Sequence, residues 1–152
     1  DCVATNLTGS YSSNAHWTLQ TPVFDLTGVT DPRLRFAHWF NMEGSATGTR
    51  YDGGNIKIST DGGTTFVPLT AGSVVPAYNG TISTSYNNPL KAQSVWTGTG
   101  TTWTVVNVNL VPNLNTLPVN QVVIRFEFGS DDGASYPGWY VDDVKVGEAA
   151  TF

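Results

Sequence analysis

The sequence predicts an all-β protein, a two-sheet antiparallel β-sandwich of the jelly-roll type. Apolar and polar residues alternate with period two in several segments that are separated by Gly, Pro, Asn and Asp. Charged residues make up 12% of the 152 residues, about half of the ~25% that is usual, and aromatic residues make up another 12%. No segment is rich in Ala, Glu, Lys and Leu, so no helix is expected.

The first half of the chain contains five expected strands. They cover residues 17–20, 23–26, 34–42, 55–59 and 65–69. The first two are short and flank Pro22. The third alternates most clearly, and places Leu34, Phe36 and His38 on one face together with Phe40. The last two flank a turn, which predicts a hairpin.

The hairpin sequence Ser59-Thr60-Asp61-Gly62-Gly63-Thr64-Thr65-Phe66 matches the pattern S-x-D-x-G-x-T-[WF], called an Asp box. Glycines supply the positive φ angles of a tight turn, and the Asp61 carboxylate accepts backbone N–H groups within it. One copy in so short a chain does not make a propeller, so Asp61 is interpreted as a structural residue.

Three further strands are expected at 103–110, 122–128 and 139–146, for a total of about eight. Residues 71–102 lack alternation and are too long for a plain connection, which predicts a structured functional loop. The last strand contains Asp142 and Asp143, although strands disfavour Asp and adjacent carboxylates repel. A bound hard cation such as Ca²⁺ is one explanation. The alternative is that one Asp faces solvent and the other caps a turn.

Other acids stand at expected strand ends or in turns, among them Glu43, Asp52 and Asp131. Ca²⁺ takes six to eight oxygen ligands, which acidic, Gly-containing loops supply. Because no linear EF-hand motif is present, a site has to be assembled from several loops. The alternative is a set of solvated turn acids.

Several other chemistries lack the residues that they need. The formal net charge of −5 and the scattered cations argue against nucleic-acid binding. His16 and His38 are the only histidines and Cys2 the only cysteine, and they are not spaced as the three or four ligands of a zinc site; no G-x-S-x-G elbow occurs. We expect a core or hydrogen-bonding role for each histidine. A glycosidase needs two facing carboxylates, which counting alone does not exclude.

Aromatic residues in or beside the expected loops are candidates for stacking on sugar rings. These are Tyr51, Tyr78, Tyr86, Trp96, Tyr136 and Trp139. The alternative is that they close the ends of the sandwich. The ligand-binding set predicted from them is Tyr78, Tyr86, Trp96 and Tyr136.

Three segments, in this order, resemble a known family: LRFAHWFNME (34–43), YDGGNIKISTDGGTTF (51–66) and VIRFEFGSDDGASYPGWYVDDVKV (123–146). They are similar to MAM-like jelly-roll modules of secreted bacterial proteins. Such modules accompany immune-inhibitor-A type (M6) metalloproteases, and related ones are the cleaved-adhesin or choice-of-anchor domains. Galactose-binding and concanavalin-like domains share the sandwich architecture. The protease motif H-E-x-x-H is absent.

The resemblance implies a jelly roll with structural Ca²⁺ and no catalytic residues. On matching positions, the implied metal ligands are Glu43, Asp52, Asp131 and Asp142. We therefore expect residues 1–152 to form one non-catalytic module, excised from a larger secreted protein, monomeric and not inserted in a membrane. It would bind polysaccharide or cell-surface glycan for attached enzyme domains. The alternatives are a structural or protein-interaction module of a metalloprotease or adhesin, and a small glycoside-active enzyme.

Overall fold

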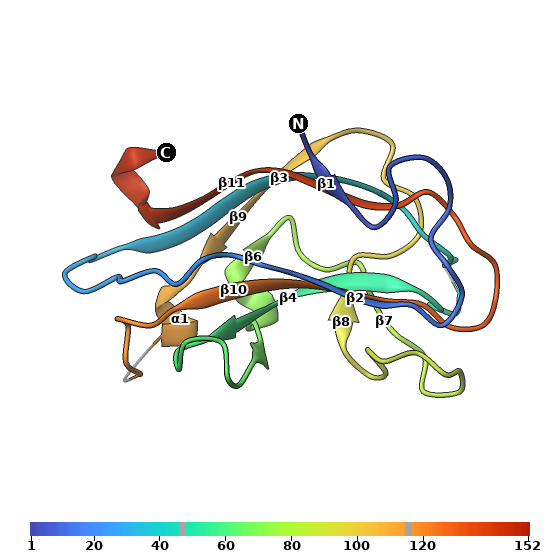
Figure 1. Ribbon diagram of the computed structural model, residues 1–152, viewed down its shortest axis with the longest axis horizontal. Helices are drawn as coiled ribbons and strands as arrows, with labels where there is room; N and C mark the ends of the chain where they lie inside the picture. Colours follow the sequence, from blue (N-terminus) through green and yellow to red (C-terminus); the bar gives the residue numbers. More distant parts are fainter. Residues whose placement is uncertain (46–47, 115–116) are drawn as a thin grey trace.

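The computed structural model describes residues 1–45, 48–114 and 117–152, and it has two antiparallel sheets packed face to face (Figure 1). The five-stranded sheet has the order β1 (Val3–Ala4), β11 (Gly138–Glu148), β3 (Pro32–Asn41), β9 (Thr104–Asn109) and β6 (Val74–Val75). The four-stranded sheet has the order β2 (His16–Gln20), β10 (Val123–Gly129), β4 (Gly53–Ser59) and β5 (Val67–Pro68). The predicted all-β sandwich is thereby confirmed.

The core lies between the sheets and follows the predicted alternation. On β3, Leu34 and Phe36 are fully buried, whereas every second residue of the strand, beginning with Arg33, is half-buried and faces outward. On β10, Ile124 and Phe126 turn inward from the opposite sheet, and the rings of Phe36 and Phe126 meet edge to face at 5.0 Å. These period-two faces hold the two layers together through apolar burial.

Two expected strands are shorter than predicted. Residues 23–26 contribute only an isolated bridge between Phe24 and Val122, and the segment 65–69 contains only the two-residue strand β5. Short pieces of helix occur at η1 (Ala71–Ser73), α1 (Val111–Leu114) and η2 (Ala149–Thr151). In the described part of the chain, no helix is both long and apolar enough to span a membrane.

The long segment 71–102 is structured, as predicted. It contributes β6 and the small hairpin of β7 (Gly80–Thr81) and β8 (Ser94–Val95). A second, small apolar cluster of Ile82, Leu90 and Val95 stabilises the part of the segment around this hairpin. Directly after β8, Trp96 forms an isolated bridge with Gly54 of β4 and so connects this segment to the four-stranded sheet.

The Asp box forms the predicted hairpin turn between β4 and β5. Gly62 and Gly63 have φ angles of 72° and 92°. The Asp61 carboxylate accepts the Ser59 hydroxyl at 2.6 Å and the backbone N–H of Thr65 at 2.9 Å. These hydrogen bonds hold the pKa of Asp61 below its ordinary value, so this acid serves the turn.

The last strand departs from simple alternation at its two acids. β11 pairs with β3 from Gly138 to Asp142 and again from Lys145, and a β-bulge separates the two stretches. Asp143 has a φ of 52°, and its backbone N–H donates to the Asp142 carboxylate at 2.8 Å. Asp tolerates this left-handed conformation better than most residues. The paired acids therefore belong to a bulge, which the period-two prediction did not include.

Candidate metal centre

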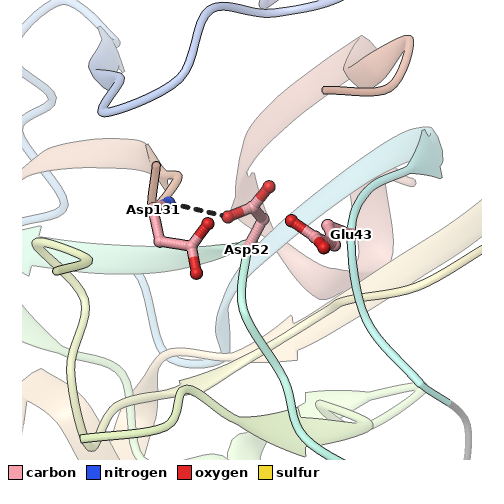
Figure 2. A group of neighbouring side chains, drawn as sticks. All are labelled: Glu43, Asp52 and Asp131. Atoms are coloured by element: carbon pink, nitrogen blue, oxygen red, sulfur yellow. Dashed lines mark hydrogen bonds between the residues drawn. The ribbon is translucent and has the colours of Figure 1, made fainter. Parts of the chain in front are cut away.

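Three of the predicted metal ligands converge at one end of the sandwich. Glu43 follows β3, Asp52 immediately precedes β4, and Asp131 follows β10. Because β3 and β4 belong to different sheets, the group connects the two layers. Figure 2 shows the three carboxylates turned toward one another. One oxygen of each lies within 4.8 Å of one oxygen of each of the others.

The centre is buried and held in place by hydrogen bonds. Asp52 and Asp131 are 1% and 3% exposed. The backbone N–H of Asp131 donates to Asp52 Oδ1 at 2.8 Å, and the Tyr11 hydroxyl donates to Asp52 Oδ2 at 2.5 Å. The backbone N–H of Glu43 donates to the same Tyr11 oxygen at 3.0 Å. A single tyrosine thus positions two of the three acids.

The loop after Asp131 is shaped closely around the acids. The backbone N–H of Gly133 donates to Asp131 Oδ1 at 2.7 Å, and that of Ala134 donates to Glu43 Oε2 at 2.9 Å. A Cβ at Gly133 would lie 2.6 Å from Glu43 Oε2 and 2.8 Å from Asp131 Oδ1. A side chain at this position would therefore force the two carboxylates to shift.

The electrostatics of the centre favour a bound cation. Burial raises the pKa of Asp52 from 3.8 to about 7, and the charges of Asp131 and Glu43 contribute in the same direction. Burial and the Asp131 charge also raise the pKa of Glu43. A cation would offset this repulsion and desolvation. Oxygen donors alone suit a hard cation such as Ca²⁺, with carbonyls and water completing its shell.

In the metal-free protein, the Asp52 carboxyl is expected to lower stability as the pH rises from about 4 to about 7, whereas buried His38, with its pKa lowered from 6.5 to about 4, acts in the opposite direction. Over this range folded Asp52, with its pKa near 7, keeps a proton that the unfolded chain, with a pKa near 3.8, has released. The free energy of unfolding of wild type and of Asp52→Asn is measured by urea unfolding in EDTA at several pH values across this range. Because His38 contributes equally to both proteins, the stability of wild type relative to the variant should fall as the pH rises. Equal slopes in the two proteins would contradict the assignment.

The fourth predicted ligand, Asp142, does not join the group. It pairs with Ala37 of β3 on the sheet, and its Oδ1 accepts the backbone N–H of Asp143 in the bulge. The three-acid group found among the described residues does not include it. The predicted role of Asp142 as a ligand is therefore not supported, because its strand position directs it to the sheet rather than to the loops.

Two of the predicted sugar-stacking residues are parts of the core. Trp96 is 2% exposed and packs edge to face against Phe36 at 5.9 Å, so it has no free face for a ligand. Tyr78 packs against Trp96 at 4.5 Å, and its hydroxyl accepts the backbone N–H of Ile56. The prediction is therefore not supported for Trp96, whereas Tyr78 is partly buried against the core. Tyr86 and Tyr136 are 40% and 38% exposed and remain available.

Both histidines have structural partners, as expected. His38 is buried, which lowers its pKa to about 4, and its Nδ1 accepts the indole N–H of Trp139 at 3.2 Å. His16 Nε2 lies 2.9 Å from the buried Glu127 carboxylate, which also pairs with Lys57. In the neutral state His38 is therefore an internal hydrogen-bond acceptor.

Sequence reasoning missed Tyr11 and Thr97. Tyr11 comes from the N-terminal segment, and its ring packs on Phe128 at 4.8 Å. The Thr97 hydroxyl donates to the backbone carbonyl of Asp52 at 2.6 Å and supports the centre from a third segment. No local motif marks either residue, because each meets the acids only through the tertiary fold.

Comparisons with known proteins add no assignment: no protein-family model matches the chain, and no similar protein is found among curated sequences.

Proposed function

We propose that this chain is a non-catalytic, calcium-stabilised β-sandwich module that attaches a larger secreted protein to carbohydrate. The observation that carries the proposal is the centre of Glu43, Asp52 and Asp131, in which two buried carboxylates and one half-buried carboxylate have oxygens within 4.8 Å of one another. Such a group is costly without a cation and stabilising with one. Calcium would then fasten the loops of both sheets at this end.

Backbone hydrogen bonds to two of the acids favour a metal centre over glycoside hydrolysis. Catalytic carboxyl groups stand about 5–5.5 Å apart in retaining glycosidases and about 6.5–9.5 Å apart in inverting ones. One oxygen of each acid lies within 4.8 Å of one oxygen of each of the others, close to the retaining range, but the backbone N–H groups of Gly133 and Ala134 already donate to Asp131 and Glu43. A substrate would have to displace these contacts.

A purely structural role within a larger protein is the second candidate. The observation that favours it is that the centre gathers four segments, since Tyr11 and Thr97 contact it together with the two acidic loops. Calcium could serve this purpose without any ligand.

A glycan array separates the two candidates. Calcium-loaded protein is expected to bind at least one class of polysaccharide, and EDTA-treated protein to bind more weakly, because its loops lose their cation. Titration calorimetry on the same preparation should show calcium uptake. Uptake without any glycan binding would favour the structural role, and the absence of uptake would refute the metal centre.

A further inference from the structure

The outer face of the five-stranded sheet presents a row of aromatic residues. Trp39 on β3 stands opposite Tyr140 on β11, and their rings meet edge to face at 5.3 Å. Trp103 directly precedes β9, whose first residue, Thr104, pairs with His38 of β3. Trp103 is 50% exposed. By the alternation of β9, Trp103 falls on the same face as Val105. Trp39 and Tyr140 are half-buried and Trp103 is exposed, and together these rings offer a stacking surface.

A polar row crosses the same face four residues away from Trp39 along β3. Arg35 of β3 lies between Asn107 of β9 and Lys145 of β11. Two cations directly opposite each other on neighbouring strands destabilise a sheet. No ion pair with either cation is found among the described residues. The row therefore costs stability and presents hydrogen-bond donors to solvent.

Between these rows the face is hollowed over a small residue. Ala37 lies there, with exposed Val105 on one side and Asp142 on the other. The hollow has a volume of about 90 Å³, and its lining includes Arg35, Lys145 and Asp143. The bulge thus brings a carboxylate beside the two cations, at the expense of a left-handed backbone.

We propose that this outer face is the carbohydrate-binding surface, and that it takes a neutral, hydroxyl-rich polysaccharide chain. The inference rests on the proposed carbohydrate role and adds to it the place and the ligand class. Asp143 in the lining of the hollow and Asp142 beside Ala37 offset the charges of Arg35 and Lys145, so this part of the face has no net charge to attract a polyanion. Sugar hydroxyls both donate and accept, and they match this mixture. The aromatic row holds the faces of the rings.

Affinity electrophoresis tests the face, in gels that contain mixed-linkage β-glucan, xylan, galactomannan or polygalacturonate. Wild type should be retarded by at least one neutral polymer. Trp103→Ala, which removes an exposed ring, and Ala37→Trp, which fills the hollow, should each weaken the affinity at least about tenfold. Tyr86→Ala is the matched control at the acidic end and should migrate as wild type does. Circular dichroism and melting in calcium confirm that the variants are folded.

Three results would overturn the inference. Binding lost in Tyr86→Ala but kept in Trp103→Ala and Ala37→Trp would refute this face and leave the carbohydrate role standing at the loops. Retardation by polygalacturonate alone would refute the neutral ligand in favour of an acidic polymer. Retardation by no polymer would refute the face together with the carbohydrate role, while calcium-dependent melting would still decide the metal centre independently.

Discussion

Calcium is expected to raise the melting temperature of the metal-free protein by about 5–10 °C. A ligand that binds only the folded state at about 100 times its Kd adds about 2.7 kcal/mol. For a domain of this size, 1 kcal/mol shifts the melting temperature by about 2–4 °C. The buried carboxylates of Asp52 and Asp131 make the effect specific to the folded state, since only folding brings them together. Differential scanning calorimetry in EDTA and in calcium measures the shift.

Magnesium provides the control for ionic strength and for non-specific binding. Mg²⁺ demands near-octahedral geometry and gives up its water reluctantly, so a weaker shift is expected at equal concentration. Identical melts in EDTA and in calcium would rule out the calcium centre. An equal shift in Asp52→Asn would show that calcium acts elsewhere on the chain.

The strands could be predicted from the sequence because their alternation is local. Residues 34–42 and 122–128 carry unbroken period-two patterns, and both form long central strands. The segment 23–26 has the same pattern yet makes only one bridge, because strand formation there depends on a partner that the local sequence does not specify. The bulge at Asp143 likewise depends on pairing with β3.

The candidate site was predicted in part for a similar reason. Acids at strand ends beside glycine mark loops, and Glu43, Asp52 and Asp131 do meet. Asp142 is one of two adjacent acids, as Asp131 is, but it lies within the sheet. Trp96 shows the same limit, since a loop-like sequence gave no sign that the residue would return to the core. Burial is a property of the assembled layers, so local composition does not determine it.

Asp52→Asn is expected to abolish calcium binding while leaving the metal-free protein at least as stable as wild type. The carboxylate is a central ligand, so calcium affinity should fall at least about a hundredfold, a change of about 2.7 kcal/mol. Without metal, the same carboxylate is buried beside two others, and its pKa near 7 means that it ionises at a cost at pH 8. Asn retains an oxygen for the Asp131 backbone N–H and removes that cost.

The sign of the change in metal-free stability separates a metal ligand from an ordinary buried acid. If Asp52 served mainly as a hydrogen-bond acceptor for Tyr11, the amide would lower the melting temperature with and without calcium alike. If Asp52 is a ligand, the variant should melt at a lower temperature than wild type only when calcium is present. Asp142→Asn is the matched control, since it also neutralises one acid but lies in the bulge, and its calcium affinity should equal that of wild type. Titration calorimetry and melting of the three proteins at pH 8 decide between these outcomes.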